Sequence, residues 1–182
     1  MAKLVSKVYG DALFEAAMEK QMLDNVYEEV SALQVIFQEN PDLVRTLNHP
    51  KIVKEEKISI LENIFSGKVS NELMGFLTII VEKGRQNDIS AIFQYFIGRV
   101  KEYKKIGTAY ITSAVELKES QKAQIKEKLL ATTEYTEFEM IYDVDPALIG
   151  GLVIRIGDRV VDSSVKTQLY ELKRDLSKLQ LA

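Results

Sequence analysis

Few side chains in this sequence could carry out chemistry, and the closest candidate pair is acidic. Asp143 and Asp145 flank Val144 in a stretch that alternates like a β-strand, so both carboxylates point to one face. A carboxylate pair can act as general acid and base if burial separates the two pKa values. The pair stands at the end of the expected strand, beside Pro146, where a solvated turn is the more ordinary interpretation. A small enzyme that uses these two residues is one hypothesis.

The other candidates point away from catalysis. His49 is the single histidine and lies between Asn48 and Pro50, so we expect a turn residue or helix cap rather than a base. The chain has no cysteine, which excludes thiolate zinc sites and cysteine nucleophiles. The Gly150-Gly151 pair leads into a strand with no Lys-Ser or Lys-Thr after it, so it predicts a tight turn and not a phosphate loop. We expect no catalytic residue, no cofactor, no metal and no small-molecule substrate.

Composition narrows the class of protein further. The 182 residues include 24 basic and 27 acidic side chains, and the densest basic stretch, residues 99–105, is interrupted by Glu102, so we expect no nucleic-acid partner. The longest apolar run, residues 76–81, is far short of the roughly 20 residues that a membrane span needs. The first residues lack the apolar segment of a secretory signal, so we expect the chain to stay in a cytosol-like compartment.

The first 105 residues read as one helix after another. Apolar spacing of three and four residues predicts six helices, near residues 5–16, 23–37, 41–47, 58–65, 73–83 and 89–100. Pro41 ends the second helix, the run from Ser70 starts the fifth, and Gly84 is placed as its C-cap. Six short helices with brief connections predict an antiparallel bundle.

The pattern changes at Gly107. Strands are expected near residues 108–117 and 138–144, a helix between them at 119–131, and a hairpin formed by residues 152–156 and 159–161. A last helix carries a heptad-like apolar stripe: Val165, Leu169, Leu172, Leu176 and Leu179. We expect this stripe to cover the small sheet, since so few turns favour a coiled coil only weakly. The fold class is therefore mainly α, with a six-helix bundle at 1–105 and a small α+β domain at 106–182.

Two helices carry apolar residues off their expected core faces. The stripe predicted for the first helix is Val5, Val8, Tyr9, Ala12, Leu13 and Ala16, which leaves Phe14 and Met18 on the opposite side. The core face predicted for the fifth helix is Leu73, Leu77, Ile80 and Val81, which leaves Ile79 outside it. Such residues could form a groove for an amphipathic partner helix. Burial all round a central helix of the bundle is the alternative.

Three segments, taken in order, resemble the delta subunit of F-type ATP synthases, whose mitochondrial counterpart is the oligomycin-sensitivity-conferring protein. Residues 9–17 (YGDALFEAA) are similar to the family's Tyr-Ala-x-Ala-Leu-Phe opening, with Gly10 where alanine is usual. Residues 81–85 (VEKGR) are similar to the end of its fifth helix. The most specific segment runs from 148 to 158 (LIGGLVIRIGD) and continues through 161–165 to Leu169; Ser163 stands where the family often has glycine.

The resemblance implies a non-catalytic connector in the peripheral stalk. It implies that the helical domain binds the N-terminal helices of the alpha subunits and that the second domain joins the C-terminal end of stalk subunit b. The implied alpha-binding groove comprises Tyr9, Ala12, Leu13, Phe76, Ile79 and Ile80. The stalk-side and signature residues are Gly150, Gly151, Arg155, Gly157, Asp158, Asp162, Ser164 and Leu169.

The resemblance also implies a location: the cytoplasmic face of a bacterial cell membrane, as a peripheral part of ATP synthase, without insertion of its own. Two alternatives stay open at this point. One is the small enzyme built on Asp143 and Asp145, and the other is a helical adaptor that acts outside the synthase.

Overall fold

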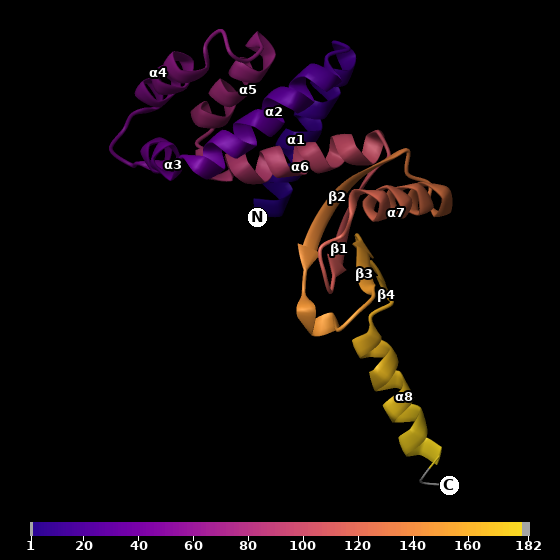
Figure 1. Cartoon of the computed structure of the whole chain (residues 1–182). Helices are drawn as coiled ribbons and strands as arrows, with labels where there is room; N and C mark the ends of the chain where they lie inside the picture. The colour runs from indigo at the N-terminus through magenta and orange to yellow at the C-terminus, as the bar shows by residue number, and fades with distance from the viewer. Residues whose placement is uncertain (1, 180–182) are drawn as a thin grey trace. The chain divides into compact units, whose positions relative to one another are not determined.

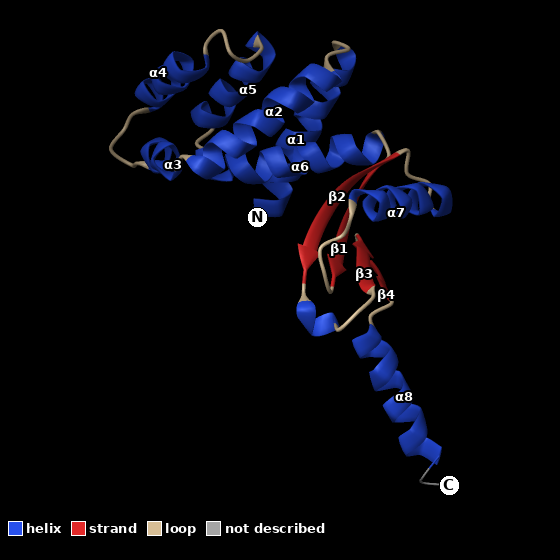
Figure 2. Ribbon diagram, in the orientation of Figure 1, coloured by secondary structure: helices blue, strands red, loops and turns tan. Residues whose placement is uncertain are grey.

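The computed structural model describes the backbone of residues 2–179 and the side chains of residues 4–177. The chain divides into two compact units, residues 1–101 and 102–182. The structure is mainly helical, with one four-stranded sheet in the second unit (Figures 1 and 2). Among the described residues, no helix combines the length and apolarity needed to cross a membrane.

Six α-helices and a short 3₁₀ turn, η1, fill the sequence up to residue 103. Their bounds are α1 Ala2–Glu19, α2 Leu23–Glu39, α3 Pro41–Asn48, α4 Lys54–Phe65, α5 Asn71–Glu82, η1 Gln86–Asp88 and α6 Ile89–Tyr103. Every predicted helix is present, and all six α-helices contribute buried side chains to one core. Phe37 lies at its centre, stacked on Phe65 at 6.3 Å between ring centroids and edge-on to Phe93 at 5.8 Å. These three rings join α2, α4 and α6.

Short polar signals end and start the helices where the sequence predicts. Ser70 caps α5, since its Oγ accepts from the Leu73 backbone N–H, while the Glu29 carboxylate of α2 accepts from both Ser70 N and Ser70 Oγ, at 3.1 and 2.7 Å. Gly84 follows α5 with φ +68°, the left-handed conformation that glycine adopts without a steric penalty. His49 is the C-cap of α3, and its Nδ1 accepts from Lys51 N, so the prediction of a cap residue is confirmed.

The rotation of α1 about its own axis is set by a close approach to α6. Gly10 is buried, and a Cβ placed on it would collide with the ring of Tyr95. The Tyr95 hydroxyl donates to Asp11 Oδ1 at 3.0 Å, which keeps the ring in place. The buried residues of α1 are accordingly small or polar for the most part: Ser6, Gly10, Leu13 and Ala17.

The second unit is a βαβ element extended by a hairpin. Its bounds are β1 Ile106–Ser113, α7 Glu119–Thr132, β2 Glu137–Val144, η2 Pro146–Leu148, β3 Leu152–Ile156, β4 Arg159–Asp162 and α8 Val165–Leu179. The sheet order is β2-β1-β3-β4, with β1 and β2 parallel and the other two pairs antiparallel. Helix α7 packs on one face of this sheet (Figure 2), where Ala109, Ile111 and Phe138 are buried among its apolar side chains. The predicted strands and the helix between them are confirmed.

The last helix does not cover the sheet, so that expectation is wrong. Leu169, Leu172 and Leu176 are 52%, 57% and 54% exposed. The side chain of Leu179, predicted as part of the same stripe, lies outside the described residues. One face of the sheet already has α7, and the other carries Tyr110 and Arg155, with the guanidinium 4.8 Å from the ring centroid. The apolar stripe of α8 therefore remains at the surface.

The Gly10–Tyr95 contact yields a stability prediction. In the wild-type chain, Gly10→Ala gains about 1 kcal/mol of helix propensity but incurs about 1–3 kcal/mol of overpacking, so we expect net destabilisation of up to about 2 kcal/mol. In a Tyr95→Ala background the ring is absent, and the same change should stabilise by about 1 kcal/mol. Urea unfolding of the four chains measures the coupling.

Gly98→Ala is the matched control, because a Cβ on Gly98 meets no atom within 4 Å. It should stabilise both backgrounds equally. If Gly10→Ala stabilises the wild-type chain as Gly98→Ala does, the Tyr95 ring moves aside and does not set the rotation of α1.

Candidate functional site

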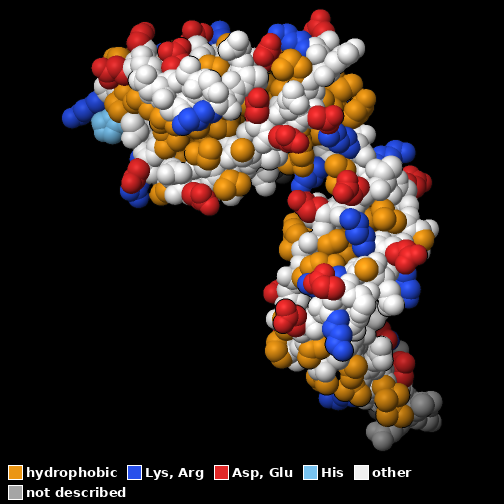
Figure 3. All heavy atoms as spheres, turned by 45° about the horizontal axis from the view of Figure 1, so that its top comes forward, with side chains coloured by type: hydrophobic (Ala, Val, Ile, Leu, Met, Phe, Trp, Pro, Cys, Tyr) orange, Lys and Arg blue, Asp and Glu red, His pale blue; other side chains and the backbone are white. Residues whose placement is uncertain are grey.

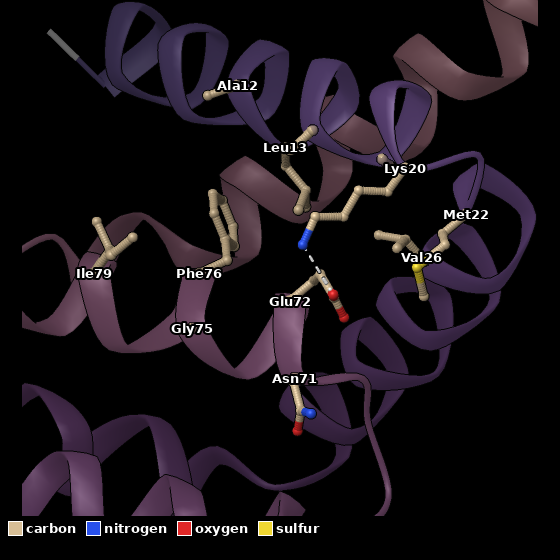
Figure 4. A pocket seen from close by; sticks show the side chains of 12 residues that line it. Ala12, Leu13, Lys20, Met22, Val26, Asn71, Glu72, Gly75, Phe76 and Ile79 are labelled. Carbon is tan, nitrogen blue, oxygen red and sulfur yellow. Dashed lines mark hydrogen bonds and ion pairs between the residues drawn. The ribbon is translucent and has the colours of Figure 1, made fainter.

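A groove of about 360 Å³ lies between α1 and α5 (Figure 4). Its lining residues are Ala12, Leu13, Ala16, Ala17, Lys20, Met22, Val26, Asn71, Glu72, Gly75, Phe76 and Ile79. All but three of them are apolar or glycine. The groove can therefore take an apolar side-chain row.

The α1 side of the groove combines three residues of that helix's apolar stripe, Ala12, Leu13 and Ala16, with Ala17 and Lys20. On a helical wheel of α1, the centre of the predicted stripe lies about 100° from the centre of the residues that are actually buried. This angle equals the rotation between two successive residues of a helix. Val8 is 57% exposed, and Ala12 and Ala16 are exposed as well. The prediction that this stripe faces the core is wrong for Val8, Ala12 and Ala16, whereas Leu13 is buried in the core and Tyr9 packs against it. Gly10 and Ala17 allow a closer approach to the neighbouring helices than larger side chains would. An apolar helix face left at the surface marks a contact surface.

The wall formed by α5 supplies an aromatic ring and an exposed isoleucine. Tyr9 and Phe76 meet edge to face, with ring centroids 6.5 Å apart, and join the two walls. Ile79 is 47% exposed one helical turn after Gly75, and a Cβ on Gly75 would meet no atom within 4 Å. The absence of a side chain at Gly75 keeps this part of the groove open.

An ion pair crosses the groove at the end where α1 finishes and α5 begins. Lys20 Nζ lies 3.0 Å from Glu72 Oε1, as Figure 4 shows. The hydrogen bond from Lys20 lowers the pKa of Glu72 below its ordinary value, helped by the charge of the ammonium. The pair is therefore intact at neutral pH and is lost as pH falls through that lowered pKa. It gives the groove a polar end while the rest of the lining stays apolar.

A second candidate surface is the stripe of α8, whose base is held by the glycine pair and a polar cap. Gly151 has φ +75°, and a Cβ on it would collide with the backbone of Ser163. Gly150 O accepts from Val165 N at 2.9 Å, and Leu152 O accepts from Ser163 N at 2.9 Å. The predicted tight turn with close backbone approach is confirmed.

The polar cap joins residues 162–167. Asp162 Oδ1 accepts from Ser164 N at 2.8 Å and Oδ2 from the Thr167 hydroxyl at 2.7 Å. Ser164 is fully buried, and its Oγ accepts from Thr167 N, which completes the N-terminal cap of α8. These hydrogen bonds, chiefly those from Ser164, lower the pKa of Asp162. The start of α8 is thus fixed to the sheet while its leucine stripe projects into solvent (Figure 3).

Comparison with known proteins decides the family. Residues 5–176 match the family described as ATP synthase delta (OSCP) subunit. The chain belongs to this family. The ATP synthase subunit delta of Lachnoclostridium phytofermentans is 59% identical over 181 residues, covering 100% of both chains, and that of Desulforamulus reducens is 36% identical over 172 residues, covering 94% of each. A chain of the Toxoplasma gondii mitochondrial ATP synthase hexamer shares the fold, with a TM-score of 0.73 at 20% identity over 94% of this chain and 96% of that one.

The six residues predicted to form the alpha-binding groove differ in how far they are exposed. Ala12 and Ile79 are exposed and Phe76 is half-buried, and all three line the groove. Tyr9 is half-buried and contacts Phe76 but does not itself line the groove. Leu13 is 3% exposed but still lines the groove. Ile80 is fully buried in the core and does not line the groove, since it lies on the face that the helical pattern assigns to the interior. Ile80 therefore cannot contact a partner unless the helical unit changes its structure.

The two residues flagged opposite the stripe of α1 also differ from expectation. Phe14 is half-buried against the core, with the Arg99 guanidinium 5.5 Å from its ring centroid. Met18 is 36% exposed. Neither lines the groove, because the rotation of α1 turns this side partly towards the interior.

The delta-family signature residues of the second unit fall into two groups. Those at the base of α8 are Gly150, Gly151, Asp162 and Ser164, followed by the exposed Leu169 on the helix itself. Those in the sheet are Arg155, which lies over Tyr110, and Gly157 and Asp158, which form the β3–β4 turn with φ +56° at Gly157. The β3–β4 turn and the cap of α8 therefore set the distances in sequence between these signature residues.

Sequence reasoning missed two features of these surfaces. Met22, the N-cap residue of α2, and Val26 of α2 also line the groove, although the spacing of the second helix marks Val26 only as core. Ile149 is 65% exposed at φ +68°, a conformation that a branched side chain adopts only under strain. The Gly150-Gly151 pair that follows it is the one sequence signal near that position.

The carboxylate pair does not form a site. Asp145 Oδ1 accepts from Ala147 N at 2.9 Å and caps η2, while Asp143 is exposed. Neither residue lines the groove. Within residues 4–177, no group of three or more His, Cys, Asp or Glu side chains is placed to hold a metal ion.

The cap predicts that Asp162→Ala loosens the first turn of α8. Loss of a capping carboxylate should speed amide hydrogen exchange at Ser164 and Thr167 by roughly twofold to thirtyfold. Because the pKa of Asp162 is lowered, its contribution is present above the ordinary value of 3.8 and is lost as pH falls through the lowered pKa. An acid titration followed by NMR shifts of these two amides should have its midpoint below 3.8, and the variant should lack it.

Asp158→Ala removes the same charge from the β3–β4 turn and is the control. It should leave exchange at Ser164 and Thr167 unchanged. Equal acceleration by both variants would show that net charge, and not the cap, holds the helix start.

Proposed function

We propose that this chain is a non-catalytic peripheral-stalk subunit of F-type ATP synthase. Residues 1–105 act as a six-helix antiparallel bundle that folds independently and binds the N-terminal helices of the alpha subunits. Residues 106–182 join the C-terminal end of subunit b. The observation that carries the proposal is that Ala12 and Ala16, from the apolar stripe of α1, are exposed and line the α1–α5 groove.

The groove has the chemistry of a helix-binding site. A partner helix with apolar residues at i, i+3, i+4 and i+7 buries them against Ala12, Phe76 and Ile79, whose rows run along α1 and α5. Its polar residues remain in water or meet the Lys20–Glu72 pair at the groove end. Small side chains on α1 and the bare Gly75 on α5 let the partner backbone approach closely.

The α8 stripe supports the contact with the stalk. Val165, Leu169, Leu172 and Leu176 repeat every four and three residues, the spacing of a coiled-coil seam. A single helix with such an exposed stripe needs a partner helix, and subunit b supplies one. The Asp162–Ser164 cap then transmits force from that helix to the sheet without a flexible joint.

In this role the chain resists torque rather than performing chemistry. It holds the catalytic head against rotation with the central rotor, so that rotor torque drives ATP synthesis and ion transport across the membrane. The subunit lies at the cytoplasmic face of a bacterial cell membrane as a peripheral component of the complex. It needs neither a cofactor nor a membrane segment of its own.

A helical adaptor outside the synthase is the competing function. It would use the same groove with a different partner helix. A pull-down from solubilised membranes with the full chain as bait separates the two functions. Recovery of the alpha and b subunits supports the stalk role, and their absence from a preparation that contains intact synthase contradicts it.

The groove predicts that Ile79→Asp weakens binding of an alpha-subunit N-terminal peptide at least about tenfold. Burying an isoleucine contributes roughly 1.5–3 kcal/mol, and about 1.4 kcal/mol is one decade in Kd. The free energy of unfolding should change by less than about 0.5 kcal/mol, because Ile79 is outside the core. Calorimetry with the peptide and urea unfolding measure the two quantities.

Val35→Asp is the control, since Val35 is 49% exposed on α2 and does not line the groove. It should leave peptide affinity unchanged. Gly75→Gln fills the groove without a clash and should also weaken the peptide, whereas Gly98→Gln on α6 should not. If Ile79→Asp unfolds the chain, or if Val35→Asp weakens the peptide equally, the groove is not the binding site.

The α8 stripe predicts that Leu172→Asp weakens binding of a peptide from the C-terminal end of subunit b. The expected loss is at least about tenfold, from the buried leucine area and the desolvated carboxylate. Tyr170→Asp is the control, because Tyr170 is 67% exposed on the opposite side of α8. Fluorescence anisotropy of the labelled peptide measures both variants, and equal losses would place the contact elsewhere.

A further inference from the structure

A second hollow, of about 510 Å³, lies in the helical unit where α4 begins and α5 ends. It shares no lining residue with the α1–α5 groove. Its charged residues are Lys54, Glu55 and Lys57, which give it a net positive lining. The proposed stalk contacts make no use of this hollow.

Lys57 is the unusual member of the lining. It is only 5% exposed, and among the described residues its ammonium has no hydrogen-bond or ion-pair partner. Lys54, one turn earlier, donates to the Glu82 carbonyl at 2.5 Å and is thereby satisfied. The aliphatic stem of Lys57 is buried and its ammonium has no partner among the described residues, so an anion in the hollow would pair with it.

Gln86 has a buried acceptor atom without a hydrogen-bond donor. Its Oε1 is buried and accepts no hydrogen bond from the described residues. The residue lines the same hollow as Lys57. One hollow thus holds a donor that needs an acceptor and an acceptor that needs a donor.

The start of α4 adds further donors. Its N-cap is Val53, which has no polar side chain to accept from the first-turn amides. Such uncapped amides and the positive end of the helix dipole favour an anion. Glu55 is the one acidic side chain in the lining, set against two lysines.

We propose that this hollow binds a phosphate group that keeps one proton. Its charged oxygens accept from Lys57 Nζ and the first-turn amides of α4, and its P–OH donates to Gln86 Oε1. Sulfate and carboxylate carry no proton at neutral pH, so they can accept from Lys57 and the amides but cannot donate to Gln86 Oε1. The need for a donor at Gln86 therefore selects phosphate among these anions. The site is independent of the stalk contacts.

Titration of the ¹⁵N-labelled full chain with sodium phosphate, at constant ionic strength near neutral pH, tests the site. Amide shifts at residues 54–57 and 86 should saturate, and sodium sulfate should bind at least about tenfold more weakly. Lys57→Met, which keeps the aliphatic stem, should weaken phosphate at least about tenfold. Gln86→Leu should remove the preference for phosphate over sulfate.

Lys51→Met is the control, since Lys51 is exposed and outside the lining. It should bind phosphate like the wild type. A parallel titration with glycerol phosphate separates the two sources of the group: binding of both ligands identifies a phosphate monoester, and binding of inorganic phosphate alone identifies the free ion.

Three results would overturn the site. They are a linear response with no saturation, equal affinity for sulfate and phosphate in the wild type, and unchanged phosphate affinity in Lys57→Met. The last two would mean an adventitious ion only. If Lys57→Met loses its native spectrum, the phosphate preference in Gln86→Leu decides the question alone.

Discussion

The contact between Gly10 and the Tyr95 ring fixes which side of α1 faces the core, and the α1–α5 groove depends on that choice. A helix buries the side on which its neighbours can approach most closely, and Gly10 and Ala17 allow such an approach. Val8, Ala12 and Ala16 of the apolar stripe are then left outside. The exposed apolar area does not stabilise the free chain, but its burial under a partner helix contributes favourable free energy to binding.

The second unit also holds a helix by close local contacts and leaves the apolar face of that helix exposed. The Gly151 backbone approaches Ser163 so closely that no side chain fits, and the Asp162–Ser164 cap fixes the first turn of α8. The sheet is covered on one face by α7, and the exposed leucine stripe of α8 covers neither that face nor the other, which carries the exposed Tyr110 and Ile141. In each unit, local polar and glycine contacts fix an element firmly while its apolar face remains exposed. Such a chain is suited to connecting partners, because its fold does not depend on the faces that it presents.

Among the described residues, the buried side-chain polar atoms without partners belong to Gln34, Asn48 and Gln86, and none of them lines the groove. Lys57 and Gln86 line one hollow, whereas the groove's own charged residues, Lys20 and Glu72, satisfy each other. This division separates an apolar surface that suits a helix from a polar hollow that suits a small anion. The two surfaces share α5 but use different parts of it, with α1 beside the groove and α4 beside the hollow.

The sequence by itself determined the elements and their order, because helix caps, strand alternation and the Gly157 turn are local signals. Ser70, Gly84 and His49 act as predicted, and the core face of α5 from Leu73 to Val81 is buried as its spacing requires. Only the tertiary structure decided which apolar faces stay outside. On α1 the most apolar side is not the buried one, since backbone proximity at Gly10 outweighs side-chain hydrophobicity. On α8 the stripe remains exposed although it has the spacing of a packed face, and whether such a face is covered depends on long-range packing that no spacing within residues 165–179 contains.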